Sequence, residues 1–336
     1  MSGNNDLSKI EFIAGVAVDT LSAAKKLREN PMDGSRTSIT IPPTRPGLSA
    51  VWRDRLAASV FVLLWCSGYP AGKIAVEHGG PFTVLAARFG VAALIFAALA
   101  LIGRAQKPSR DALLHSSVIG FLSLAVSFGG IYTGLKLGVS TGIAALFIGA
   151  MPLTTALFAT VLGERLHPRQ WVGLAFGFIG VVLVLEGRFG GGGSSTLGYL
   201  ASVIGLIGLS IGTLYQKRYS GSVDLRVGLA VQHAVAFVVM LPVAAFVERF
   251  EADWSGAYLG AVGWLVLVNS VGGFALLFWL LRRGAATSVA ALFYLMPPIT
   301  ALMGFVVLGE KLALPMLPGF VLVAAGVWLG TRNAAK

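Results

Sequence analysis

The chain has 336 residues, of which 56% are hydrophobic and only 12% are charged. Soluble domains carry roughly 25% charged residues, and the apolar residues here form long blocks, so the composition excludes a soluble protein. The net charge of +11 does not indicate nucleic-acid binding, because the basic residues are scattered between apolar blocks. The composition instead predicts an all-α polytopic membrane protein.

Residues 1–48 differ from the rest of the chain, because they are polar and contain several prolines. We expect a disordered cytoplasmic tail here. Two alternatives stay open. Residues 10–27 can form a short amphipathic helix at a membrane surface, or residues 1–31 precede a true start at Met32 and do not belong to the native protein.

Ten apolar blocks follow, each close to the roughly 20 residues that a membrane-spanning helix requires. They lie near 56–76, 82–102, 112–134, 139–162, 171–187, 197–219, 227–247, 256–281, 287–308 and 315–331. A flexible Gly/Ser linker at 189–196 divides residues 49–188 from residues 197–336. We therefore predict ten transmembrane helices, five on each side of the linker.

The distribution of basic residues predicts the orientation of these helices. Fifteen Lys and Arg residues between Arg45 and Lys336 fall on the side of the N-terminus, and the other side holds only Lys136, Arg188, Arg249 and Lys311. Because cytoplasmic loops are enriched in Lys and Arg, we expect both termini to face the cytoplasm.

The two halves of the chain repeat one another. Residues 135–166 align without gaps to residues 281–312, and 14 of the 32 positions are identical, including Thr141/Thr287, Pro152/Pro298 and Glu164/Glu310. With five spans in each copy, the second copy enters the membrane from the opposite side. Such inverted repeats are typical of transporters whose binding site lies between the halves.

The stretch Leu63–Phe89 and the matched turns Gly-Glu-Arg-Leu at 163–166 and Gly-Glu-Lys-Leu at 309–312 resemble the drug/metabolite transporter superfamily, in its ten-helix EamA-type branch. This resemblance implies two EamA-like five-helix repeats at 49–188 and 197–336, a central cavity, and export of small metabolites or drugs across the plasma (inner) membrane. It extends over about residues 56–331.

Ionisable side chains inside spans are costly and are therefore candidates for substrate contacts. Arg88 suits a carboxylate or phosphate, and its alternative is a structural arginine that binds backbone carbonyls. His233, beside Gln232, corresponds to Arg88 after a shift of 145 positions. It is either a proton-titrating group or a neutral hydrogen-bonded histidine. Lys73 either extends to the interface or faces an anionic substrate.

Aromatic and amide side chains complete the predicted lining, since ligand sites are mostly apolar with a few polar groups. The alternative for each aromatic residue is packing in the core or against lipid. Asn269 is the best candidate after Arg88, because an amide inside a span requires a partner. The predicted substrate-binding set is Trp65, Tyr69, Lys73, Arg88, Tyr132, Tyr215, Gln232, His233, Asn269 and Tyr294.

Two further pairs of matched residues lie on the fourth and ninth spans. Pro152 and Pro298 interrupt the helical hydrogen bonds and are predicted hinges, with a static kink as the alternative. Glu164 and Glu310 follow these spans, and we expect their carboxylates to accept hydrogen bonds at the start of the fifth and tenth helices.

The chain is not predicted to be an enzyme, and we expect no catalytic residue, metal site or cofactor. Its four histidines lie on four different segments, and no Asp or Glu lies near the middle of a span. The expected partners are a small-molecule substrate and the lipid bilayer, with no nucleic acid, and a homodimer stays open. The alternatives to a carrier are a channel or facilitator without alternating access and, less favoured, a membrane-embedded enzyme.

Overall fold

The computed structural model describes residues 48–161, 163, 166–189, 196–219, 223–282, 296–310 and 317–331. Within these ranges the regular structure is helical, and the β-type pairing consists of one isolated bridge between Gly79 and Ala252. The predicted tail at 1–48 and linker at 189–196 lie almost entirely outside the described residues, so the domain division stays a prediction.

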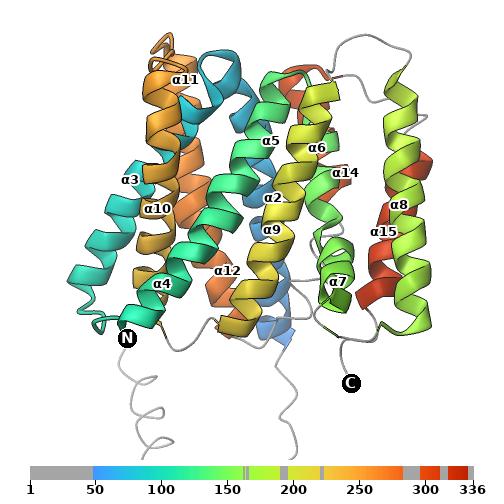
Figure 1. Cartoon of the computed structure of the whole chain (residues 1–336), viewed down its shortest axis with the longest axis horizontal. Helices are drawn as coiled ribbons and strands as arrows, with labels where there is room; N and C mark the ends of the chain where they lie inside the picture. The colour runs from blue at the N-terminus through green and yellow to red at the C-terminus, as the bar shows by residue number, and fades with distance from the viewer. Residues whose placement is uncertain are drawn as a thin grey trace, which may run out of the picture. The chain divides into compact units, whose positions relative to one another are not determined.

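The helices form a bundle, and most of the close packing is between helices that are distant in sequence (Figure 1). Up to residue 189 they are α2 (Leu48–Glu77), α3 (Pro81–Ile102), α4 (Arg110–Ile119), η1 (Gly120–Val126), α5 (Ser127–Lys136), α6 (Thr141–Gly149), α7 (Met151–Val161) and α8 (Pro168–Phe189). From residue 196 they are α9 (Thr196–Tyr219), α10 (Leu225–Phe246), α11 (Gly256–Trp264), η2 (Leu265–Gly272), α12 (Gly273–Arg282), α14 (Met296–Leu308) and α15 (Leu317–Thr331).

Two of these elements are π-helical and lie inside longer helices. The π-helix η1 joins α4 to α5, and η2 joins α11 to α12 without a break in the helical backbone. A π-helix widens the turn and is often found at functional sites. The two π-helices begin at Gly120 and Leu265, a separation within one residue of the offset between the repeated segments.

Seven helices of the described chain are long and apolar enough to cross a membrane. They are Leu56–Glu77, Pro81–Ile102, Arg110–Lys136, Thr141–Val161, Thr196–Tyr219, Leu225–Phe246 and Gly256–Leu277. Three shorter apolar helices, Pro168–Leu183, Met296–Leu308 and Leu317–Leu329, fall where the fifth, ninth and tenth spans were predicted. The all-α, membrane-type fold is thus as predicted, and the number of ten spans stays a prediction.

One end of the bundle is closed by hydrogen bonds between loops and helix starts, and we call it the Glu248 end. The Glu248 carboxylate accepts from the backbone N–H of Phe82 at 3.0 Å and from the N–H and hydroxyl of Thr83 at 2.7 and 2.8 Å. These groups start α3 and have no helical acceptor of their own, so an anion there is stabilised by the helix dipole.

At the same end Glu310 accepts hydrogen bonds from the backbone N–H of Thr141 at 3.0 Å and from its hydroxyl at 2.7 Å. Thr141 starts α6, so the prediction that Glu310 serves the start of the following, tenth helix was wrong. The carboxylate joins two helices distant in sequence because α14 and α6 pack side by side. Glu164 lies outside the described residues.

A side-chain contact and a backbone hydrogen bond add to the closure of the Glu248 end. His78 Nδ1 lies 2.6 Å from Asp253 Oδ2, and Gly80 N–H donates to the carbonyl of Glu251 at 2.8 Å. Hydrogen bonds from the backbone and hydroxyl of Ser255, with a smaller one from His78, lower the pKa of Asp253 to about 2. The carboxylate therefore stays ionised across the physiological pH range.

Four helix pairs form the main packing contacts: α3 with α10, α5 with α9, α6 with α14 and α8 with α15. In Figure 1 α8 and α15 lie together at one side, and α5 and α9 lie adjacent near the centre. Between α5 and α9 the backbones touch, because a Cβ on Gly130 would meet the carbonyl oxygen of Ala201 and approach Gly205 N to 2.7 Å. Small residues permit such close approach in membranes.

We expect Gly130→Ala to destabilise the fold by about 1–3 kcal/mol, because the new methyl group must push α5 away from α9. Thermal unfolding in detergent measures this as a lower Tm. Gly260→Ala is the matched control, since a Cβ there meets no atom within 4 Å. It should leave Tm unchanged or raise it slightly, and equal effects of both substitutions would contradict the close packing of α5 on α9.

Candidate substrate-binding site

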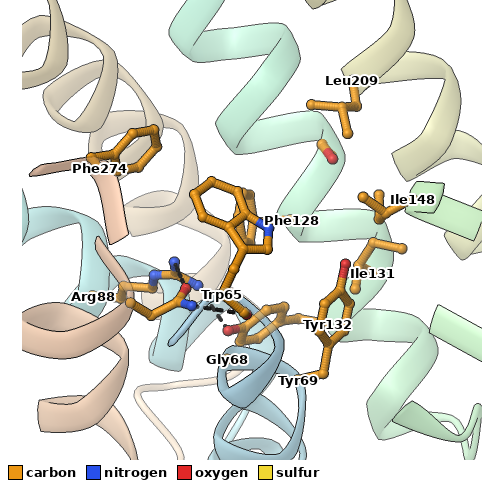
Figure 2. A pocket seen from close by; sticks show the side chains of 12 residues that line it. Trp65, Gly68, Tyr69, Arg88, Phe128, Ile131, Tyr132, Ile148, Leu209 and Phe274 are labelled. Atoms are coloured by element: carbon orange, nitrogen blue, oxygen red, sulfur yellow. Dashed lines mark hydrogen bonds between the residues drawn. The ribbon is translucent and has the colours of Figure 1, made fainter. Parts of the chain in front are cut away.

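A cavity of about 80 Å³ lies where α2, α3, α5 and η2 meet, with α6, α9 and α12 completing its wall. Aromatic side chains form much of the lining, and Ile131, Ile148 and Leu209 lie on the side of the view away from Arg88 (Figure 2). The cavity is therefore amphipathic, with a guanidinium on one side and apolar groups on the other.

The Arg88 side chain is 3% exposed and is held by three hydrogen bonds from three of its nitrogens. Nε donates to Ser270 Oγ at 3.0 Å, Nη1 to the Tyr132 hydroxyl at 2.9 Å, and Nη2 to Asn269 Oδ1 at 2.7 Å. The acceptors come from α5 and η2, so the guanidinium links elements that are far apart in the sequence. Because the three hydrogen bonds point in different fixed directions, they hold the plane of the guanidinium in one orientation.

No acidic side chain balances this charge. All three hydrogen-bonding partners of Arg88 are neutral, and within the described ranges no carboxylate lies within 4 Å of the guanidinium. The Phe128 ring centroid lies 4.6 Å from Cζ, which gives a favourable cation–π contact. A buried, unpaired cation is costly, so an anion bound in the cavity would be strongly favoured.

Asn269 is itself fixed by α2. Its amide nitrogen donates to the carbonyls of Leu64 and Trp65, both at 3.1 Å, and this leaves Oδ1 directed at Arg88. A Cβ on Gly68 would lie only 2.5 Å from that amide nitrogen, so glycine permits α2 and η2 to approach. Asn269 and Ser270 are consecutive residues of the π-helix η2, whose turn is wider than that of an α-helix. Both side chains accept a hydrogen bond from Arg88.

The structure brings five of the ten predicted site residues together around the cavity: Trp65, Tyr69, Arg88, Tyr132 and Asn269. His233 is buried behind Phe274 and does not line the cavity. Gln232 does not line the cavity either, and its backbone packs against Gly120. Tyr294 lies outside the described residues.

Two other predicted residues have partners elsewhere. The Lys73 ammonium donates to the carbonyl of Leu135 at 2.7 Å and lies 3.7 Å from the Glu77 carboxylate, towards the Glu248 end. The Tyr215 hydroxyl lies 2.8 Å from His115 Nδ1, where α9 packs on α4. In this conformation neither side chain lines the cavity.

The predicted hinge prolines lie at helix starts. The fourth span is divided at Ala150, between α6 and α7, and Pro152 is the second residue of α7. Pro298 is the third residue of α14, and the residues before Met296 are outside the described ranges. Their role as pivots stays a prediction.

The sequence reasoning did not name Ser270, which bonds Arg88, or Phe274, which lines the cavity. Ser270 accepts the third hydrogen bond of Arg88, and Phe128 and Phe274 form aromatic walls. Ser270 follows Asn269 directly, and in a regular α-helix consecutive side chains point in directions about 100° apart. Phe128 and Phe274 are 146 positions apart, which is the offset of the repeat, and this spacing was the available signal.

The family model of the EamA-like transporters matches the chain twice, over residues 55–186 and 196–332. The chain belongs to the EamA-like transporter family. It is thus a member of a family of membrane transporters, in agreement with the resemblance seen in the sequence. Both members of the repeated segment fall inside the two matched regions.

Similar proteins carry transporter names. The "Uncharacterized inner membrane transporter YedA" of Escherichia coli strain K12 is 28% identical over 251 residues, which cover 75% of this chain and 81% of that protein. The "Uncharacterized transporter YvbV" of Bacillus subtilis strain 168 is 24% identical over 287 residues (84% and 93%). The "Probable amino-acid metabolite efflux pump" of Salmonella typhimurium strain LT2 is 26% identical over 290 residues (82% and 94%).

A solved crystal structure has the same fold as this EamA-like chain. The two superpose with a TM-score of 0.59 over 85% of this chain and 99% of the other, at 23% sequence identity.

We expect Tyr132→Phe to destabilise the protein by about 2 kcal/mol, because it leaves a buried guanidinium N–H without an acceptor. Thermal unfolding of the purified protein in detergent, without added ligand, provides the measurement. Tyr258→Phe is the matched control, since the buried Tyr258 hydroxyl has no hydrogen-bonding partner among the described residues. An unchanged Tm for Tyr132→Phe would mean that this hydrogen bond does not hold Arg88.

Proposed function

We propose that the chain is a secondary transporter that exports small metabolites across the inner membrane by alternating access. Its membership of a transporter family supports the class, and the name of its Salmonella relative, a probable amino-acid metabolite efflux pump, supports the direction and the size of the substrate. The name of the relative YedA supports the inner membrane as the location.

The observation that carries the proposal is the buried Arg88 guanidinium, which has three neutral acceptors and faces an amphipathic cavity. A transporter must bind its substrate away from bulk water and then release it, so a preformed group with unsatisfied charge is suited to that task. In our proposal Arg88 binds a carboxylate or phosphate group of the substrate, and the aromatic and aliphatic walls contact its apolar part.

The proposed mechanism uses two inverted five-helix repeats and ten spans. The double match of the family model supports this arrangement, as does the repeat spacing of η1 and η2. If the halves exchange conformations, the cavity opens to the opposite side. The conformation described has a closed Glu248 end, which in our proposal is the outer end, with both termini cytoplasmic.

A small metabolite of the proposed kind requires a cavity larger than the volume of about 80 Å³ found here. We propose that this conformation is a contracted state, and that the walls around Leu209 and Ile148 separate when an amino-acid-sized solute binds. Leu209 and Ile148 are apolar, but a hydrogen bond between the hydroxyls of Thr154 on α7 and Ser210 on α9 lies beside them and must break or shift when these walls separate.

Counterflow in proteoliposomes tests the transport proposal. Vesicles loaded with the metabolites that a comparison of culture media identifies as exported should accumulate labelled external substrate transiently. We expect Arg88→Ala to reduce this uptake at least tenfold, because a charge-assisted bidentate contact of about 1.5–3 kcal/mol is lost. Arg226→Ala is the control, since that arginine pairs with Asp224 at a helix start.

Each outcome of this experiment has a clear reading. Trans-stimulated exchange supports a carrier, and uptake without trans-stimulation would support a channel instead. If Arg88→Ala reaches the membrane in normal amount and transports at the wild-type rate, Arg88 does not bind the substrate.

A second prediction concerns the closed Glu248 end. Glu310→Ala removes the hydrogen bonds that join α14 to the start of α6, so we expect this end to open more often. In a Cys66→Ala background, a cysteine placed at Ile131 in the cavity should react about three to ten times faster with an impermeant thiol reagent supplied from that side.

The matched control for this accessibility measurement is Glu251→Ala. Glu251 lies at the same end, but it uses its backbone carbonyl and not its carboxylate to bind Gly80. Equal labelling rates for Glu310→Ala and Glu251→Ala would argue against a gate that Glu310 stabilises.

A further inference from the structure

His233 is a buried histidine with one unused nitrogen. Its side chain is 1% exposed, and its Nδ1 lies 2.8 Å from the carbonyl oxygen of Leu229. A carbonyl only accepts hydrogen bonds, so Nδ1 must carry a hydrogen, and in the neutral ring Nε2 is left as a bare acceptor. Within the described part of the chain Nε2 has no hydrogen-bonding partner.

Three phenylalanines surround the imidazole. The ring centroids of Phe96, Phe89 and Phe274 lie 5.1, 5.7 and 5.9 Å from that of His233. The imidazole crosses the rings of Phe96, Phe89 and Phe274 at interplanar angles of 48°, 75° and 81°. Burial among apolar rings disfavours an uncompensated imidazolium, so a proton on Nε2 requires a nearby anion that balances its charge. A phenylalanine in place of His233 would fill the same space without a buried unsatisfied atom.

Two of these phenylalanines also connect the histidine to the binding site. The Phe89 ring contacts both basic groups. Its centroid lies 5.8 Å from Arg88 Cζ and 5.7 Å from the centroid of the His233 imidazole. Phe274 lines the cavity and contacts His233. Phe274 therefore forms part of the wall between the cavity and His233.

Few other charged groups lie on the elements around His233. The elements packed on α10 are α3, η1 and α4, and Phe274 brings α12 close as well. On all of these, and on α10 itself, the titratable and charged residues are Arg88, Arg110, Asp111, His115, Arg226 and Arg282. Among them Arg88 is the one that shares an aromatic contact with His233, and η1 has no titratable residue.

We propose that Nε2 of His233 is a proton-binding site that is linked to anion binding at Arg88, so that an anionic substrate and a proton are carried together. This inference rests on the proposed function, because it requires an anion at Arg88. With Arg88 unneutralised, its positive charge opposes a second positive charge on His233 through a medium of low dielectric constant. An anion on Arg88 removes that opposition, and a proton from water in the cavity then forms an N–H bond at Nε2.

The linkage is reciprocal, so protonation of His233 strengthens anion binding by the same factor. A monovalent anion and one proton cross the membrane without net charge. Efflux of this kind is driven by the outward gradient of the substrate and does not require a carboxylate inside a span.

Binding measurements with purified protein test the linkage directly. The probe is N-acetyl-phenylalanine, which has a carboxylate and an aromatic body but no amine, and its uncharged amide serves as the control ligand. Trp65 lines the cavity, so its fluorescence reports binding. From pH 7.5 to pH 5.5 we expect the affinity for the carboxylate to rise at least tenfold, with about one proton taken up per anion in weakly buffered solution.

The variant His233→Asn retains an N–H donor for the Leu229 carbonyl but has no titratable group. It should bind the probe with an affinity that is independent of pH, and without proton uptake. His233→Phe provides a second variant if the first is unstable, since it fills the aromatic enclosure. Arg88 keeps its charge throughout this pH range, so it cannot produce the pH dependence.

The outcomes separate the linkage from the proposed function. Binding of the carboxylate without pH dependence in the wild type, or equal pH dependence in the wild type and both variants, would overturn the linkage and leave the anion site standing. No binding of the carboxylate at any pH, or equal binding of the uncharged amide, would overturn the anion site and the linkage together. The linkage would also be supported if His233→Asn still shows counterflow of the substrate but no longer accumulates the substrate in response to a pH gradient.

Discussion

The guanidinium of Arg88 is the constraint on which the other features of this molecule depend. A full positive charge that is 3% exposed inside an apolar bundle is stable only when its N–H groups are bonded in fixed directions. The acceptors on α5 and η2 provide this, and each is itself fixed by backbone packing, Asn269 most clearly through the carbonyls of α2. The stability of the helical core and the geometry of the cavity are therefore set by the same contacts.

The neutrality of these acceptors distinguishes a binding site from a structural ion pair. If one of them were a carboxylate, the charge would already be satisfied and an incoming anion would have to displace it. With Tyr132, Asn269 and Ser270 the hydrogen-bonding geometry is satisfied while the charge is not. The carboxylates of Glu248 and Glu310 lie instead at the Glu248 end, where they bind helix starts in partly buried positions.

The two halves use one scaffold for different polar groups. Phe128 contacts Arg88 in the first half, and Phe274, its equivalent in the repeat, contacts His233, the equivalent of Arg88. Asn269 in η2 has Ser123 of η1 as its counterpart, and the Ser123 hydroxyl is buried without a partner among the described residues. The first half holds the permanent cation and one of its acceptors, Tyr132, while the other two acceptors, Asn269 and Ser270, come from the second half. The second half also holds the imidazole of His233, whose Nε2 has no partner among the described residues. In our proposal this asymmetry allows the two positions to bind different ions, an anion at Arg88 and a proton at His233.

How much of this was visible in the sequence depends on the kind of signal. The lengths of the apolar blocks predicted the helices, and the repeat predicted that Arg88 and His233 occupy corresponding positions in the two halves. Both signals can be read from the linear order of residues. Lys73 and Tyr215 do not line the cavity in this conformation, and the sequence does not show this, since their contacts with Leu135 and His115 depend on how helices pack. In apolar helices every face is hydrophobic, so periodicity does not say which face meets the cavity.

The π-helix η2 has no sequence signature of its own. It turns Ser270 towards Arg88, and Ser270 makes one of the three contacts that hold the guanidinium. A site built on such local irregularities becomes visible only when the neighbouring helices that stabilise them are also placed.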